Sequence, residues 1–326
     1  MADDKPRALV LAPFRGEGFD LLREVADVVY DPWIEHSPLR LYKQPELAQR
    51  LLDEGATILV CEGDKVDGPV LDVPLRVIGS TRGDPTNVDI PAATAKGIPV
   101  LNAPGRNADA VAELTIALMF AVNRHVIRAD GDVRRGDMYA GGTIPYQRFR
   151  AWQLAGRTLG IVGLGAIGRA VRWRAEGLGM KTLAYDPYAN DANAALDEVL
   201  TESDVITMHA PVTEETKGMI GEKQFAAMRD GAIYLNLARA HLHDTDALVA
   251  ALESGKLGGA GLDHFEKEYL APDAPLAALP NVVLTPHIGG ATYDTEANHA
   301  LMIATDIARL LRGERPERCV NPEVLD

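Results

Sequence analysis

Short apolar segments alternate with helical segments along this chain, and this alternation constrains the fold more than any other feature. Between residues 157 and 285, six segments rich in aliphatic and β-branched residues are separated by stretches with helical spacing. The six expected strands are 157–163, 181–186, 205–210, 232–238, 258–265 and 281–285. Such alternation predicts a parallel sheet with helices on both faces, and six strands fit a Rossmann-type doubly wound domain.

Shorter segments before residue 105 predict a second α/β domain, which a chain of 326 residues has room for. From Asn107 the apolar residues indicate one long helix to residue 136, with Asn107 as its N-cap. A last helix is expected at 293–312, because Gly313 and Pro316 follow it as stop signals. The expected elements of the second domain are strands at 7–13, 56–63, 75–81 and 98–104, and a helix at 44–55.

Charge and composition narrow the classes of function. A net charge of −14 disfavours nucleic acid and anionic membranes as partners. No apolar run approaches the roughly 18 residues that span a bilayer, and the N-terminus lacks the apolar stretch of a signal peptide. Two cysteines, Cys61 and Cys319, form no CxxC pair, and no HExxH occurs, so no metal site is predicted. We therefore expect a cytoplasmic protein, in which local arginines would have to attract any anionic substrate.

The segment TLGIVGLGAIGRAV places Gly163, Gly165 and Gly168 between an apolar strand and a helix. The first glycine permits a tight turn, the second lets the backbone approach a pyrophosphate, and the third lets the helix pack on the sheet. Asp186 ends the next strand, where its carboxylate would bind a ribose and repel a 2′-phosphate; Pro187, not an arginine, follows it. These features predict an NAD site, with NAD favoured over NADP; the alternative is a structural turn without a ligand.

Three ionisable residues, Arg239, Glu268 and His287, follow the ends of expected strands. Ligands of open α/β sheets bind at this edge. Histidine exchanges protons near neutral pH, a neighbouring carboxylate stabilises its charged form, and arginine binds carboxylates. Beside a nicotinamide cofactor, the three residue types suit hydride transfer between a secondary alcohol and a ketone.

Together these motifs resemble the D-isomer-specific 2-hydroxyacid dehydrogenase family, over about residues 50–312. HAPVTEETKGMI (209–220) is similar to its His-x-Pro-x-Thr-x-x-Thr signature, and GLDHFEKE and LTPHIGGAT to the segments with its carboxylates and histidine. The resemblance implies that Arg239 binds a small anionic 2-hydroxy or 2-oxo acid, and that Glu268 tunes the catalytic His287. Further cofactor contacts that it implies are Ala166, Ile167, His209, Ala210, Pro211, Thr216, Leu237, Ala238, Asp263 and Gly289.

The resemblance also implies how the domains are arranged. A smaller, flavodoxin-like α/β substrate domain would consist of residues 1–101 and the returning segment 291–326. Residues 102–290 would form the dinucleotide-binding domain, through which a homodimer would assemble.

The expected substrate loop, STRGDPTNVD (80–89), departs from the family's usual glycine-rich turn. Arg82, Gly83 and Asp84 are the expected substrate-binding residues in it. An inward-pointing Arg82 would favour a second anionic group, such as a phosphate, phosphonate or carboxylate; the alternative is an outward-pointing surface charge. Two further departures are His264, where valine is usual, and Tyr269, where proline is usual.

Three related functions compete with a D-2-hydroxyacid dehydrogenase. Formate dehydrogenases share the fold but pair the histidine with glutamine, so Glu268 argues against them. Corepressors that resemble this family and sense NAD(H) keep all three ionisable residues, so the residues do not exclude them. Phosphoglycerate dehydrogenases often carry an extra regulatory domain, although short forms exist.

Overall fold

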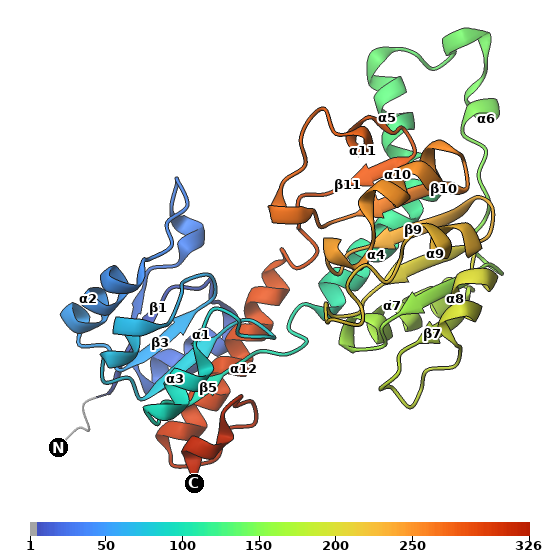
Figure 1. The fold of residues 1–326 in the computed structure, drawn as a ribbon. Helices are drawn as coiled ribbons and strands as arrows, with labels where there is room; N and C mark the ends of the chain where they lie inside the picture. The colour runs from blue at the N-terminus through green and yellow to red at the C-terminus, as the bar shows by residue number, and fades with distance from the viewer. Residues whose placement is uncertain (1–4) are drawn as a thin grey trace. The chain divides into compact units, whose positions relative to one another are not determined.

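The structure, a computed structural model, describes residues 5–326, and the chain divides into two compact units (Figure 1). The discontinuous unit consists of Met1–Arg106 and Thr292–Asp326, and the continuous unit consists of Asn107–Ala291. The crossings at 106–107 and 291–292 lie slightly C-terminal to the expected boundaries, 101–102 and 290–291. Each unit contains a parallel sheet covered by helices, which confirms the α/β fold class.

The discontinuous unit is built on a five-stranded parallel sheet with the order β2-β1-β3-β4-β5, the flavodoxin-like arrangement. Successive residues of β1 face opposite sides of this sheet, so Leu9 packs with α2 while Ala8 and Val10 pack with α1 and α12. Its strands are β1 Arg7–Val10, β2 Asp27–Tyr30, β3 Ile58–Cys61, β4 Val77–Ser80 and β5 Val100–Leu101. Its helices are α1 Gly16–Val25, α2 Gln44–Glu54, α3 Ile90–Ala95 and α12 Tyr293–Leu311.

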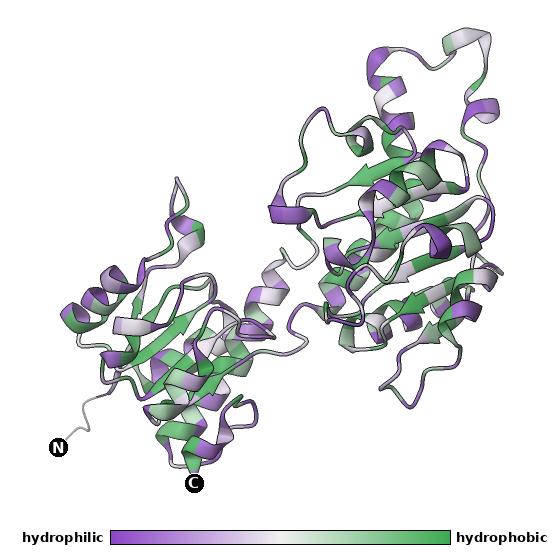
Figure 2. Cartoon of the chain, viewed as in Figure 1, coloured by the Kyte–Doolittle hydropathy of each residue, from purple (hydrophilic) through white to green (hydrophobic). Residues whose placement is uncertain are grey.

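The continuous unit is built on a six-stranded parallel sheet with the order β11-β10-β9-β8-β6-β7. All six expected strands are present, and their apolar residues are visible in Figure 2. The order reverses between β6 and β8, and in doubly wound sheets the ligand binds at such a switch point. The strands are β6 Thr158–Val162, β7 Lys181–Tyr185, β8 Val205–Met208, β9 Ala232–Asn236, β10 Leu257–Leu262 and β11 Val282–Leu284.

Helices cover both faces of this second sheet. Helices α4 and α7 pack on one face, and α8, α9 and α10 pack on the other. The helices are α4 Ala108–Asn123, α5 Val126–Arg135, α6 Pro145–Arg148, α7 Ala166–Gly177, α8 Leu196–Glu202, α9 Glu222–Ala227, α10 Thr245–Glu253 and α11 Pro275–Ala278.

The prediction of one long helix from Asn107 is wrong, because the segment forms two helices, α4 and α5, bent by 60°. The break lies at His125, whose φ of +54° is left-handed. Helix α4 is apolar and packs on the sheet, whereas α5 buries no residue and is largely polar (Figure 2). Asn107 occupies the N-cap position without a side-chain cap.

Within residues 5–326, no single helix is long and apolar enough to cross a membrane.

Candidate functional site

The glycine loop joins β6 to α7 at the switch point of the larger sheet. Gly163 has a φ of +96°, and a Cβ there would lie 2.5 Å from the backbone nitrogen of Ala210. A Cβ on Gly168 would lie 2.1 Å from the carbonyl oxygen of Gly163, so the helix and the loop touch through backbone alone. Gly165 differs from both, because a Cβ there would meet nothing within 4 Å.

The open space at Gly165 suits a bound phosphate group. Gly165 is the N-cap of α7 and makes no side-chain cap, so the first N–H groups of the helix remain available to an anion. The loop therefore has the two properties that a pyrophosphate requires, a backbone that can be approached closely and free N–H donors.

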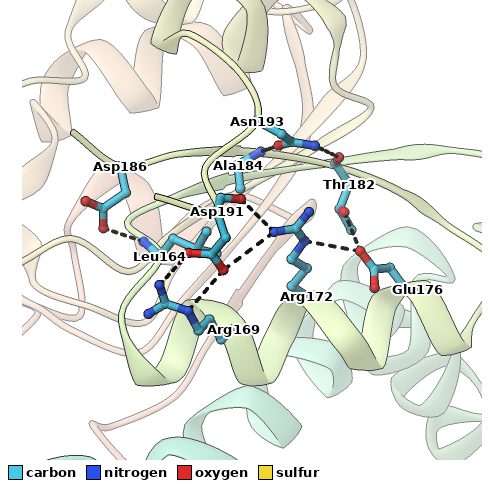
Figure 3. Close-up of polar contacts among 9 residues, drawn as sticks. All are labelled: Leu164, Arg169, Arg172, Glu176, Thr182, Ala184, Asp186, Asp191 and Asn193. Carbon is cyan, nitrogen blue, oxygen red and sulfur yellow. Dashed lines mark hydrogen bonds and ion pairs between the residues drawn. The ribbon is translucent and has the colours of Figure 1, made fainter. Parts of the chain in front are cut away.

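Asp186 follows β7 and lies against the glycine loop (Figure 3). Its Oδ2 accepts a hydrogen bond from the Leu164 backbone N–H at 2.7 Å, and its Oδ1 accepts one from that of Tyr188 at 2.8 Å. These bonds hold the carboxylate beside the loop, as expected of a residue that binds a ribose.

Two arginines of α7, Arg169 and Arg172, hold the loop that follows Asp186. Arg169 donates to the carboxylate of Asp191 through Nε at 3.1 Å and Nη2 at 2.5 Å, and Arg172 donates to the Asp191 carbonyl oxygen at 3.0 Å (Figure 3). The hydrogen bond from Arg169 lowers the pKa of Asp191. The same hydrogen bond, assisted by the charges of Asp191 and Asp186, raises the pKa of Arg169. The sequence interpretation, which considered only the residue after Asp186, missed these arginines.

His287 and Glu268 form a hydrogen-bonded pair at the C-terminal ends of β11 and β10. Nδ1 of His287 lies 3.0 Å from Oε1 of Glu268, so a proton on Nδ1 is held by the carboxylate and Nε2 is left for other partners. Both residues have left-handed backbones, with φ of +55° and +54°. Strained backbone of this kind is concentrated at functional sites.

Asp263 fixes the turn that carries His287. This buried carboxylate accepts hydrogen bonds from the Thr285 hydroxyl at 2.6 Å and from the backbone N–H groups of Ile288 at 2.9 Å and Gly289 at 2.8 Å. Its observed partners therefore belong to the loop itself, and its expected contact with a nicotinamide carboxamide stays a prediction.

Arg239 follows β9 and is exposed. Its Nη1 donates to the Ala238 carbonyl oxygen at 2.6 Å, and within residues 5–326 it makes no ion pair. It lies at the same edge of the sheet as Glu268, because β9 and β10 are neighbouring parallel strands.

His264 is a member of the site to which the sequence assigned no role. Its ring lies 3.9 Å from that of His287, centroid to centroid, and it is buried. Burial, followed by the charges of His287 and Arg239, lowers the pKa of His264 to about 4. The only local signal was a histidine at a position where the resemblance led us to expect valine.

The segment after β8 borders the glycine loop, since Ala210 is the residue that a side chain on Gly163 would strike. Nδ1 of His209 is buried and has no hydrogen-bond partner among the described residues. The Thr216 hydroxyl donates to the Pro211 carbonyl oxygen at 2.6 Å and so closes the turn. The remaining expected cofactor residues lie at the start of α7 and after β9.

Arg82, Gly83 and Asp84 lie in the discontinuous unit, at the C-terminal end of β4. The loop is held in place through its backbone, because the Arg82 carbonyl oxygen accepts from the Ala103 N–H at 2.8 Å and that of Gly83 accepts from the Asn102 side chain at 2.7 Å. The half-buried Arg82 side chain forms no ion pair within residues 5–326. Arg82 is thus a cation that has no partner carboxylate, and it lies at the edge of the sheet where α/β proteins bind ligands.

Comparison with known proteins adds to this geometry. Residues 116–289 match the model of the D-isomer specific 2-hydroxyacid dehydrogenase, NAD binding domain. The chain is 36% identical to a glyoxylate reductase of Thermofilum pendens over 98% of this chain and 96% of that protein. It is 40% identical to a D-3-phosphoglycerate dehydrogenase of Archaeoglobus fulgidus over 81% of this chain, but it spans only 51% of that relative's length. A solved structure from Thermus thermophilus aligns with a TM-score of 0.81 and 37% identity, covering 96% of this chain and 99% of that one.

Proposed function

This chain belongs to the D-isomer specific 2-hydroxyacid dehydrogenases, which are NAD-dependent oxidoreductases, and on that premise we propose that it reduces a 2-oxo acid to the D-2-hydroxy acid, and catalyses the reverse, by hydride transfer. The observation that carries this proposal is the His287–Glu268 hydrogen bond at the C-terminal edge of the nucleotide-binding sheet. The comparisons give no support to an NAD(H)-sensing corepressor.

The acid–base steps belong to His287. NAD(H) supplies or accepts the hydride. Glu268 holds the Nδ1 proton and stabilises the imidazolium, while Nε2 gives its proton to the carbonyl oxygen during reduction and takes it back during oxidation. Arg239, which has no acidic partner in residues 5–326, binds the substrate carboxylate. Turnover of NADH with a panel of 2-oxo acids tests this assignment. If NADH is oxidised with none of these acids, the assignment is wrong.

NAD is held by the continuous unit, which also carries Arg239. The glycine loop and the N-terminus of α7 bind the pyrophosphate, and Asp186 binds the adenosine ribose. Other proposed cofactor contacts are Ala166, Ile167, His209, Ala210, Pro211, Thr216, Leu237, Ala238, Asp263 and Gly289.

The preference for NAD over NADP is expected to depend on both Asp186 and Asp191. Asp186→Ala should lower kcat/KM with NADH by about 10- to 100-fold, because a charge-assisted hydrogen bond to the ribose is lost. The double variant Asp186→Ala/Asp191→Asn should have a higher kcat/KM with NADPH than Asp186→Ala alone, since Arg169 is then free to bind a 2′-phosphate. Asp191→Asn alone, with Asp186 intact, is the matched control. Equal use of both cofactors by the unaltered protein would contradict the preference.

We also propose a cytoplasmic homodimer that assembles through the continuous unit. Supporting this, large apolar and aromatic side chains are exposed along α5, α6 and the segments beside them. They include Ile127, Val133, Tyr139, Tyr146 and Trp152. The net charge of −14 disfavours nucleic-acid and membrane partners. A monomer mass by light scattering would contradict the dimer, and recovery in a membrane fraction would contradict the location.

The substrate carries a second anionic group, bound by Arg82 in the loop that also holds Gly83 and Asp84. The names of relatives include both glyoxylate reductase and D-3-phosphoglycerate dehydrogenase, so substrates with one and with two anionic groups are the pair to compare. A phosphorylated or phosphonate-bearing 2-oxo acid should exceed glyoxylate in kcat/KM, because Arg82 offers a charge-assisted contact of about 1.5–3 kcal/mol.

Arg82→Ala should remove most of this advantage, a loss of about 10- to 100-fold that appears mainly in KM because the contact is remote from the reacting carbon. Arg76→Ala is the matched control, since Arg76 is an exposed arginine without an ion pair in residues 5–326, just before the opposite end of β4. If the ranking of the two substrate classes survives Arg82→Ala, Arg82 is only a surface charge.

A further inference from the structure

Three potential metal ligands, His264, Glu268 and His287, come together in the continuous unit. One ligand atom from each lies within 4.8 Å of those of the other two. Nδ1 of His287 is already 3.0 Å from Oε1 of Glu268, and the two imidazole rings are 3.9 Å apart. Only the last two residues take part in the acid–base pair, so His264 is a third ligand that proton transfer does not require.

His264 is the fixed member of this group. It is buried, whereas the side chains of His287 and Glu268 are about half exposed. The packing around His264 therefore sets the position of one imidazole, and neutral imidazole is the form that binds a metal ion.

We propose that His264, Glu268 and His287 bind a divalent transition-metal ion of the Zn²⁺ type, and that the bound ion inhibits the dehydrogenase. Two imidazole nitrogens and one carboxylate oxygen make a three-residue zinc site, with water as the fourth ligand. The ion takes the place of the proton between His287 and Glu268. The imidazolium form releases its Nδ1 proton to water, whereas the neutral form keeps its single proton, on Nε2. In either case the ring has no acidic proton left for the carbonyl oxygen. Mg²⁺ and Ca²⁺, which prefer oxygen ligands, bind weakly here.

The required adjustment is small. Ligands at about 2.0–2.1 Å from a tetrahedral ion are roughly 3.4 Å apart, so no pair of ligand atoms has to approach by more than roughly 1.4 Å. The side chains of His287 and Glu268 are 47% and 59% exposed, which leaves them room to move toward the buried His264. Within residues 5–326 these three residues are the only such group of histidine, cysteine and acidic side chains.

Titration of the purified chain with Zn²⁺ by calorimetry, and with Co²⁺ by visible absorption, tests this site without any turnover. We expect saturable binding of one ion per chain, and inhibition of NADH oxidation that EDTA reverses. His264→Val should weaken the binding of the ion and the inhibition by at least roughly 10- to 100-fold, the loss that follows even when only a partner of a metal ligand is removed. His264→Gln keeps a polar side chain of similar size, so a defect in folding can be told apart from loss of a ligand.

His36→Gln is the matched control, because His36 pairs with a single carboxylate, Asp31, in the discontinuous unit. This variant should bind Zn²⁺ as the unaltered chain does. Unchanged affinity in both His264 variants, no saturable binding by the unaltered chain, or an equal loss in His36→Gln would each overturn the site. The binding titration needs no turnover, so its result tests the metal site even if the chain reduces no 2-oxo acid. Failure of the proposed reaction and failure of the metal site can therefore be told apart.

Discussion

Replacing His287 with alanine is expected to lower kcat for 2-oxo acid reduction by about 10²–10⁴-fold, the range for losing a general acid. The carbonyl oxygen then has to take its proton from water, whereas the glycine loop that binds the cofactor is untouched. NADH affinity, measured by fluorescence titration, should therefore stay nearly constant. Near-normal turnover in this variant would place the acid on another residue.

The carboxylate partner gives a second, graded test of the same pair. Glu268→Gln keeps the shape of the side chain but removes the charge beside the imidazolium, so the protonated histidine is harder to maintain. The rate of reduction should then begin to fall at a lower pH than in the unaltered enzyme. Glu266→Gln, which removes an acid from the same 3₁₀ turn without touching His287, should leave the profile unchanged.

Alanine at Gly168 is expected to disrupt the fold of the continuous unit, whereas alanine at Gly165 should affect only the cofactor. The added Cβ at Gly168 would lie 2.1 Å from a backbone oxygen, so α7 must move away from the loop. Overpacking of this kind costs about 1–3 kcal/mol and sometimes more, which urea unfolding would report as a lower free energy of unfolding. NADH affinity should fall with it.

Gly165→Ala separates binding from stability. Nothing lies within 4 Å of the added Cβ, and a φ of −73° suits alanine, so the free energy of unfolding should hardly change. The methyl group would instead occupy the space into which the pyrophosphate must come, and NADH affinity should drop. Normal affinity in this variant would show that the pyrophosphate does not approach Gly165.

The sequence predicted the larger sheet better than the smaller one, for a physical reason. The four inner strands of the continuous unit, β6, β8, β9 and β10, are almost wholly buried and form continuous apolar runs, which made them predictable. Strand β2 was missed because it is short and partly buried, and only two of its four residues, Val28 and Val29, are aliphatic. The break at His125 was missed because helical spacing continues across it, and only the exposure of α5 distinguishes the two helices.

Some features of the candidate site could likewise be predicted from the sequence and others could not. Arg239, Glu268 and His287 were predictable because each follows a strand, and the ends of parallel strands share one edge. The contact between His264 and His287 was not, since it depends on left-handed backbone at Glu268 and His287, which no local pattern predicts. Likewise, the pairing of Arg169 with Asp191 depends on how the loop after β7 folds back on α7.

The return of the chain to its first unit has a consequence for biosynthesis. Helix α12 covers one face of the five-stranded sheet through Ile303 and Ile307, and Asn321 accepts a hydrogen bond from the backbone N–H of Val100 in β5. A ribosome therefore makes this sheet first and its cover last, with the entire nucleotide-binding unit translated in between. Helix α1 covers part of this face at once, but the part that α12 covers stays exposed during that interval, so chaperones can bind it while the nucleotide-binding unit is made.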